Sequence, residues 1–345
     1  MADLKEFIRG MPKAELHMHL EGAFEPALVE RIARRNNLPV PAEVQKSLAQ
    51  SQSGGSSGFA FDDLSSFLAV YYQSMSVLQT ADDFHDLAWH YLSTAHAQNI
   101  VYAELFFDPQ AHTSRGVKFE TVITGYHSAV VAARSKLGIS ASLILCFLRD
   151  HSASSAEQTL TEALPHRDKF IGIGLDSDER DNPPSKFAGV FAQARAHGFK
   201  LTMHADVDQI NSIEHIRQAI EEIGVDRLDH GTNIVESPAL VEVVRARGIG
   251  LTSCPVSNSV INAKDFKGKE ILTLLRDGVK VTVNSDDPAY FRAYLSENLE
   301  MLAERMDGVT KGDLIHLQKN AFEVAWLSDE ERGKFIARLE EYGRG

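Results

Sequence analysis

Apolar residues gather in short runs along this chain, and few of these runs show the strict alternation of a half-exposed strand. Continuous apolar runs of this length are typical of parallel strands that are covered on both faces. The expected strands are Ala14–Leu20, Ile100–Phe107, Ile139–Leu148, Phe170–Asp176, Phe199–His204, Arg227–His230, Gly248–Cys254 and Val279–Asn284.

Stretches with apolar residues at three- and four-residue spacing separate most of the expected strands, as in amphipathic helices. Strand and helix therefore alternate along the chain, which predicts a parallel sheet of the α/β class. Eight such strands predict a (β/α)8 barrel of the TIM type, formed as a single domain by residues 1–345. The helices expected between the later strands are Thr121–Ser135, Lys186–Ala196, Ser212–Ile223, Pro238–Arg247 and Lys269–Arg276.

The connection after the first expected strand is long, and its pattern predicts a helical insertion over residues 21–98. Its expected helices are Glu25–Asn36, Asp63–Leu78 and Ala81–Gln98. Within it, residues 47–58 read S-L-A-Q-S-Q-S-G-G-S-S-G, a composition that predicts a mobile, unpacked loop. This loop is either a lid over the barrel mouth or a plain surface insertion.

The composition and net charge indicate which kinds of molecule this protein binds. The 345 residues are 43% hydrophobic and carry a net charge of −13, with a pI of about 5.5. A large core is therefore expected, whereas an acidic chain is poorly suited to nucleic acid or an anionic membrane. We expect a small-molecule substrate, no nucleic acid partner and no membrane partner, while the oligomeric state is left open.

Three further features predict a cytoplasmic protein. The two cysteines, Cys146 and Cys254, lie in apolar strand-like segments and give no sign of a disulfide framework. No apolar stretch approaches the roughly 20 residues of a membrane-spanning helix. The N-terminal segment lacks the apolar run and the cleavage site of a signal peptide.

Metal-ligand residues stand at the ends of several expected strands. His17 and His19 are two residues apart, so on a strand both rings face the same side. His204 and Asp286 end two other strands, and the carboxyl ends of barrel strands share one face. Three histidines and one aspartate suit one zinc-like ion with a position left for water. Each histidine taken alone is also compatible with a buried ring bonded to a backbone carbonyl.

Four segments in this order resemble the adenosine/adenine deaminase family of metal-dependent amidohydrolase barrels. They are P-K-A-E-L-H-M-H-L-E-G, M-H-A-D, L-D-H-G and V-N-S-D-D-P-A-Y-F, and they run from Met11 to about Phe291. The segments A-E-L-F-F-D-P-Q, F-L-R-D and G-I-G-L-D-S-D-E are similar to the branch that prefers the free base adenine.

The resemblance implies a ligand set and a base. His17, His19, His204 and Asp286 match the residues that bind one zinc ion in the family. His230 matches the histidine that orients the attacking water or takes its proton, a task that suits imidazole near neutral pH.

The resemblance also implies substrate contacts. Asp287 matches the aspartate that holds purine N7, although it is equally placed to cap the helix expected after it. Gly174 lies in the segment of the purine-binding loop, where a glycine lets the backbone approach a flat ring; it is otherwise a tight strand ending. Asp176 follows in the same segment and is a further candidate for substrate binding.

One segment departs from the family pattern. The family reads H-A-G-E after the fifth strand, and its glutamate protonates purine N1. This chain has Val207 at the matching position, and valine cannot donate a proton. The flanking Asp206 and Asp208 are the candidates for the acid; alternatively they cap the next helix, or the substrate needs no donor of this kind.

The resemblance thus implies zinc-dependent hydrolysis of adenine to hypoxanthine and ammonia. Deamination of adenosine or of an N6-substituted adenine is the nearest alternative. A catalytically inactive purine-binding protein is another, since Val207 replaces the usual acid. Hydrolysis of a non-purine amide or ester is a further one.

Overall fold

Eight parallel strands form the centre of the molecule, in the spatial order β1 to β8. The fold is seen in a computed structural model, which describes residues 2–52, 59, 61, 64–206, 210–262 and 265–344. The strands are β1 (Lys13–His19), β2 (Ile100–Phe107), β3 (Ser140–Leu148), β4 (Gly172–Asp176), β5 (Lys200–Ala205), β6 (Arg227–His230), β7 (Gly250–Ser253) and β8 (Val281–Val283).

Backbone hydrogen bonds between β1 and the segment after β8 bring the two ends of the sheet together. The amide of His19 donates to the carbonyl of Asp286 over 2.9 Å, and the amide of Asp286 donates to the carbonyl of His17 over 3.1 Å. These bonds place the H-x-H pair and Asp286 side by side. The expected (β/α)8 barrel is therefore confirmed.

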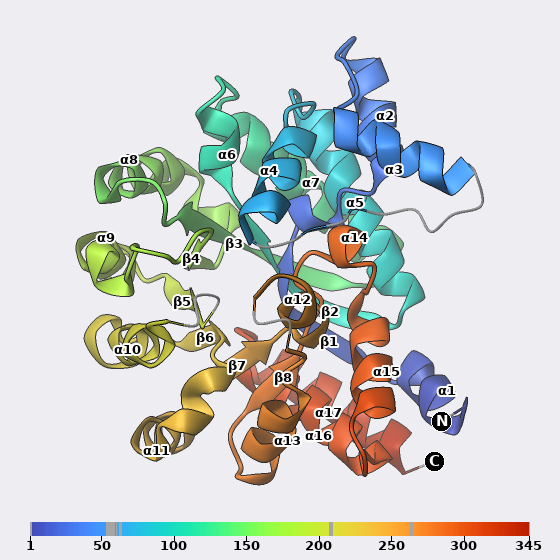
Figure 1. Ribbon diagram of the computed structural model, residues 1–345, viewed down its shortest axis with the longest axis vertical. Coiled ribbons are helices and arrows are strands. Elements are labelled where there is room, and N and C mark those ends of the chain that lie inside the picture. Colours follow the sequence, from blue (N-terminus) through green and yellow to red (C-terminus); the bar gives the residue numbers. More distant parts are fainter. Residues whose placement is uncertain are drawn as a thin grey trace.

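Helices surround the barrel, as Figure 1 shows, and bury the outer faces of the strands. Most connections after β2 hold at least one helix that packs back on the sheet. The α-helices from residue 100 onward are α6 (Pro109–Thr113), α7 (Phe119–Lys136), α8 (Ala153–Ala163), α9 (Ala188–Ala196), α10 (Ser212–Arg217), α11 (Pro238–Arg247), α12 (Pro255–Ser257), α13 (Gly268–Arg276), α14 (Pro288–Phe291), α15 (Leu295–Arg305), α16 (Lys311–Val324) and α17 (Asp329–Gly343). Short 3-10 or π segments are η2 (Leu164–Lys169), η3 (Pro184–Phe187), η4 (Gln218–Ile223), η5 (Thr232–Glu236) and η6 (Asn258–Asn262).

The expected insertion between β1 and β2 is helical. It contains η1 (Glu21–Ala23), α2 (Pro26–Arg35), α3 (Ala42–Gln52), α4 (Leu64–Met75) and α5 (Ala81–Ala97). Helix α5 packs against α7 and β2 on the outside of the barrel, whereas α4 contacts η1, α6 and η6 at the mouth. The helix that covers the mouth is therefore α4.

The prediction of a mobile, unpacked loop over residues 47–58 is wrong for its first part. Residues 47–52 continue α3, and Ser47 is buried while Leu48 packs against the core. The contact of Leu48 with the core holds this stretch in the helix, although residues 49–51 are exposed. Residues 53–58 lie outside the described part of the chain.

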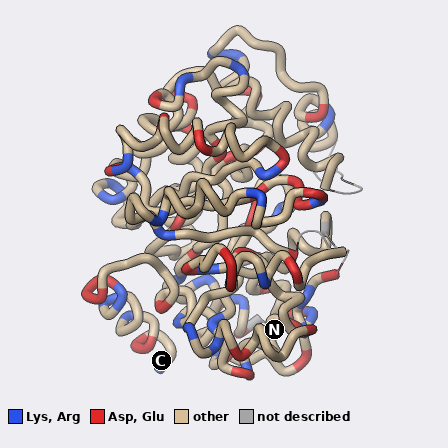
Figure 2. Tube along the Cα trace, turned by 90° about the vertical axis from the view of Figure 1, so that its left-hand side faces the viewer, with Lys and Arg blue, Asp and Glu red and all other residues tan. Residues whose placement is uncertain are grey.

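Acidic and basic residues are interspersed along the outer helices, as Figure 2 shows. The two termini lie close together in Figure 1, and the Tyr342 hydroxyl of α17 donates to the carbonyl of Phe7 in α1 (Ala2–Gly10) over 2.9 Å. Among the helices that the structure describes, none combines the length and apolar character needed to cross a membrane.

Candidate metal and active site

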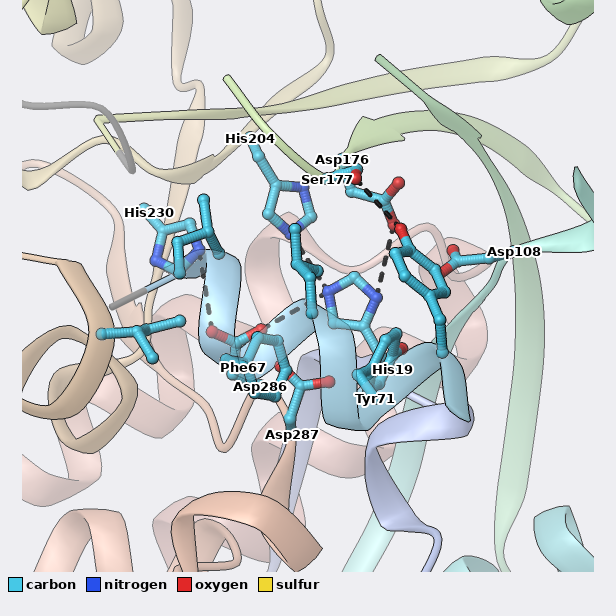
Figure 3. Close-up of a pocket in the computed structure, with 14 residues that line it drawn as sticks. His19, Phe67, Tyr71, Asp108, Asp176, Ser177, His204, His230, Asp286 and Asp287 are labelled. Carbon is cyan, nitrogen blue, oxygen red and sulfur yellow. Dashed lines mark hydrogen bonds and ion pairs between the residues drawn. The ribbon is translucent and has the colours of Figure 1, made fainter. Parts of the chain in front are cut away.

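His19, His204, His230 and Asp286 meet at the carboxyl ends of the strands (Figure 3), and His17 lies against Asp286. Asp286 Oδ1 lies 3.2 Å from His17 Nε2 and 3.4 Å from His19 Nε2. The Nε2 atoms of His19 and His204 are 3.1 Å apart. His230 Nε2 lies 3.8 Å from Asp286 Oδ2. All five side chains are buried.

The chemistry of this cluster fits a divalent cation. His17 Nδ1 lies 3.1 Å from the Thr252 carbonyl, which only accepts, so Nδ1 carries the proton and Nε2 keeps its lone pair. That lone pair faces the Asp286 carboxylate without a hydrogen-bond partner among the described residues. His17, His204, His230 and Asp286 each offer a ligand atom within 4.8 Å of the others. Neutral imidazole and carboxylate are ligands of zinc-like ions.

The outer nitrogens of His17, His19 and His204, the three histidines expected to bind metal, meet polar groups that orient them. His17 Nδ1 meets Thr252, and His19 Nδ1 lies 3.4 Å from Asp176 Oδ2. His204 Nδ1 lies 3.6 Å from Asp229 Oδ2. Partners of this kind fix the ring orientation of metal-binding histidines. Asp229 had not been singled out in the sequence, although it precedes His230 in L-D-H-G.

The backbone at four strand ends turns through the left-handed region. Ser177, Asp206, His230 and Asp286 have φ of 74°, 67°, 57° and 65°. This conformation costs a non-glycine residue about 1–3 kcal/mol and persists only where the surroundings impose it. The buried Arg149, missed in the sequence, is part of those surroundings, since its Nη1 donates to the His204 carbonyl over 2.8 Å.

A cavity opens beside the cluster. Helix α4 forms one wall with Phe67, Tyr71 and Tyr72, and the histidines and Asp286 form the floor. Phe67 and Tyr71 also pack on Tyr290 of α14, with ring centroids 5.6 and 5.4 Å apart. A mostly apolar wall opposite a polar floor suits a small flat ligand with a polar edge.

Asp287 lines this cavity, and its geometry does not support the capping role considered for it. It stands at the N-cap position of α14, but its side chain makes no capping hydrogen bond. Gly22 in η1 leaves room for it, because a Cβ there would lie 2.7 Å from Asp287 Cα. Burial and the neighbouring Asp286 raise the pKa of Asp287 well above its ordinary value.

Asp176 also lines the cavity, together with Asp108, a residue of F-F-D-P-Q that had not been chosen from the sequence. A ligand atom from each lies within 4.8 Å of the other and of a His19 nitrogen. Burial and the Asp176 charge raise the pKa of Asp108 well above its ordinary value. Burial raises the pKa of Asp176 to about 7. The far wall of the cavity is thus a pair of closely spaced carboxyl groups.

Gly174 has a different place from the one expected. It lies inside β4, and a Cβ there would meet the Cys146 sulfur on β3 at 2.5 Å. It is not among the residues that line the cavity. The glycine is therefore required for strand packing, and Asp176 and Ser177 are the residues of this segment that reach the cavity.

Of the two acid candidates, only Asp206 is described. Its Oδ2 accepts from the Asn233 amide over 2.7 Å and from the Thr232 hydroxyl over 3.3 Å. Asp206 thus ties the end of β5 to η5, and burial raises its pKa to about 6. Asp208, with Val207, lies outside the described residues.

Comparisons with known proteins agree with this geometry. The family model for adenosine deaminase matches residues 12–342. An adenine deaminase of Wolinella succinogenes is 45% identical over 340 residues, covering 98% of this chain and 100% of that protein. An adenine deaminase structure from Arthrobacter aurescens has a TM-score of 0.90 at 36% identity, covering 97% of this chain and 100% of the other. A zinc-bound amidohydrolase from Burkholderia ambifaria has a TM-score of 0.88 at 26% identity, covering 100% and 93% of the two chains.

A parallel barrel with histidine and aspartate ligands at the carboxyl ends of its strands defines the class of metal-dependent amidohydrolases. Within this class, the chain belongs to the adenosine deaminase family.

Proposed function

We propose that this protein catalyses the hydrolytic deamination of adenine to hypoxanthine and ammonia. The observation that carries the proposal is the set of short contacts that join His17, His19, His204 and Asp286 beside a cavity bordered by His230 and Asp287. The full-length similarity to adenine deaminases supports the free base as the substrate.

We further propose zinc as the resident ion, one per chain, held by His17, His19, His204 and Asp286. The nitrogen-rich ligand set supports zinc, and the similar Burkholderia amidohydrolase contains it. When bound, such an ion lowers the pKa of a coordinated water toward about 7. The ligand histidines need their Nε2 atoms unprotonated for this, as the contacts of His17 Nδ1 already require.

His230 is the proposed base. Burial and the neighbouring His17 lower its pKa, so the ring is neutral near pH 7 and accepts a proton from the attacking water. Its Nε2 faces Asp286, so the ring borders the metal cluster. Asp287, whose side chain is not used as a helix cap, is the proposed partner of N7.

The proposed acid is one of Asp206 and Asp208. Asp208 is the better candidate, because the Asp206 carboxylate is engaged by Asn233 and Thr232. We expect Asp208→Asn to lower kcat by about 10²–10⁴, the range for loss of a general acid. Asp206→Asn is the matched control, since its carbonyl oxygen still accepts from Asn233. Steady-state kinetics on both variants distinguish the two; a larger loss in Asp206→Asn would assign the acid to Asp206.

The direct test measures ammonia release by zinc-replete protein with adenine, N6-methyladenine and adenosine at equal concentrations. Faster turnover of adenine is the expected result. Faster turnover of adenosine or N6-methyladenine would change the assigned substrate and keep the chemistry. Tight purine binding without ammonia from any of the three would contradict the proposal.

A further inference from the structure

Asp108 is a buried carboxyl group whose position no fold requirement explains. It is 2% exposed and stands at the N-cap position of α6, yet its side chain makes no capping hydrogen bond. Its Oδ1 has no hydrogen-bond partner among the described residues. Instead the side chain lines the cavity, on the side away from His230 (Figure 3). A buried polar atom without a partner costs about 1–3 kcal/mol, so a ligand that satisfies it is expected.

The order of polar groups around the mouth matches the order of edge atoms around adenine. From C6, the ring edge runs through N7, N9, N3 and N1 back to C6. Around the barrel, Asp287 follows β8, Asp108 follows β2, Asp176 and Ser177 end β4, and Asp206 follows β5. Figure 3 shows Asp287, Asp108, Asp176 and His204 in this same cyclic order, with His230 closing the circle.

With C6 at the metal cluster and N7 at Asp287, N9 faces Asp108. The next atom, N3, faces Asp176 and Ser177, and N1 faces the carboxyl end of β5. This orientation rests on the proposed function, because it takes C6 as the reacting atom and Asp287 as the partner of N7.

We propose that Asp108 accepts a hydrogen bond from the ring N9–H of a free purine base and so selects the base against nucleosides. In a nucleoside, N9 carries a sugar carbon and has no hydrogen to donate. The same sugar would also meet Asp108, which is fixed by its buried position beside Asp176. Sites built to hydrogen-bond a substrate N–H reject analogues that lack it, because their buried polar group is left unpaired.

The test compares adenine with 9-methyladenine, which keeps every ring atom but lacks the N9 hydrogen. Asp108→Asn keeps an acceptor oxygen, whereas Asp108→Leu has a similar volume and no acceptor. Asp150→Asn is the matched control, because it removes an exposed carboxylate after β3 at the same end of the barrel.

We expect Asp108→Leu to lower kcat/KM for adenine by about 10- to 100-fold, the cost of leaving the N9–H donor unpaired in a buried site. In Asp108→Leu, kcat/KM for 9-methyladenine should not fall. The ratio of kcat/KM for adenine to that for 9-methyladenine therefore decreases by the same factor. Asp108→Asn should retain more of the preference than Asp108→Leu, and Asp150→Asn all of it. A preference for adenine that is unchanged in Asp108→Leu would overturn the assignment.

Equilibrium binding makes this test independent of turnover and of folding defects. Titration calorimetry compares the affinities for hypoxanthine and 9-methylhypoxanthine, and so measures the preference for a base with an N9 hydrogen without any turnover. Only variants whose zinc content and melting temperature match the wild type are compared. If wild-type protein released no ammonia from adenine, the proposed function would fail. If the wild type bound hypoxanthine more tightly than 9-methylhypoxanthine and Asp108→Leu did not, Asp108 would still be supported as the N9–H acceptor. An equal preference for hypoxanthine in the wild type and in Asp108→Leu would refute it.

Discussion

Asp229 illustrates how residues outside the cavity set the geometry of this site. Its Oδ1 accepts from the Thr252 hydroxyl over 2.8 Å, and its Oδ2 accepts from the Thr202 hydroxyl over 2.7 Å. The same carboxylate lies 3.6 Å from His204 Nδ1 and 4.0 Å from His17 Nδ1. One buried carboxylate therefore faces two of the three ligand histidines.

We expect Asp229→Asn to weaken zinc binding by about 10- to 100-fold, because an amide orients the two imidazoles less strongly than a carboxylate. Competition with a chromophoric chelator measures this affinity directly. Thr202→Val, which removes one donor to Asp229 and leaves the carboxylate in place, should have a smaller effect. Equal zinc affinity in Asp229→Asn and wild type would exclude this role.

Gly22 offers a second residue-scale test. A Cβ at this position would overlap the backbone and side chain of Asp287, so the aspartate has to move. We expect Gly22→Ala to lower kcat/KM for adenine by at least tenfold while zinc content stays at one per chain. Gly312→Ala, where the nearest atom to a new Cβ is 3.5 Å away, is the control. Unchanged kinetics in Gly22→Ala would mean that Asp287 does not need its present position.

The proposed ligand residues could be chosen from the sequence, whereas Asp108 and Asp229 could not, for a physical reason. His17 and His19 can be recognised from their spacing alone, because residues i and i+2 share a face of a strand. Asp108 precedes Pro109, a pair that reads as an ordinary helix start. Only the backbone geometry shows that its side chain turns into the cavity instead.

At the scale of elements, Asp83 joins α2 to the start of α5. It accepts from the amides of Gln79 and Thr80 over 2.9 and 2.8 Å, and from Asn36 Nδ2 over 2.7 Å. Arg35 Nε donates to it over 3.0 Å. Burial alone would raise the pKa of Asp83, but these hydrogen bonds outweigh it and lower the pKa below the ordinary 3.8.

We expect Asp83→Ala to lower the free energy of unfolding by about 1–3 kcal/mol near pH 7, the cost of losing a helix cap and its partners. Since the folded pKa is depressed, this contribution is present above about pH 4 and disappears as the pH falls through the folded pKa. Urea unfolding at several pH values measures it, with the exposed neighbour Asp82→Ala as control. If the difference in the free energy of unfolding between the wild type and Asp83→Ala persisted far below pH 4, the ionised Asp83 carboxylate would not be its source.

Elements with a clear pattern were predicted closely from the sequence. The bounds of β2, β6 and α11 agree with the expected Ile100–Phe107, Arg227–His230 and Pro238–Arg247. The whole of α3 (Ala42–Gln52) was missed, because its Ser- and Gln-rich end favours a loop, whereas contacts of Leu48 with the core stabilise the helix there. Tertiary packing of this kind cannot be read from local composition.

At the scale of the whole molecule, the metal site joins parts of the barrel that are far apart in the sequence. His17 and His19 come from β1, His204 from β5 and Asp286 from the segment after β8. The order of strands from β1 to β8 made this convergence predictable, since all carboxyl ends open on one face. Distances inside the site depend on side-chain packing and became visible only in the structure.

Because the ligands meet only in the folded chain, bound metal should stabilise the fold. An ion present at 1,000 times its dissociation constant stabilises by about 4 kcal/mol. We therefore expect removal of metal by a chelator to lower the melting temperature by several degrees, and zinc to restore it. Calorimetry on Asp286→Ala provides the control, since this variant should respond to neither treatment. A wild-type melting temperature that ignores both would show that the cluster does not bind the ion.

The most direct test of the central claim titrates zinc into metal-stripped protein while the conversion of adenine to hypoxanthine is followed by absorbance. The account predicts no turnover without metal and a rise that reaches its plateau at one zinc ion per chain. Full activity in the metal-free protein, or no hypoxanthine at any zinc concentration, would contradict it.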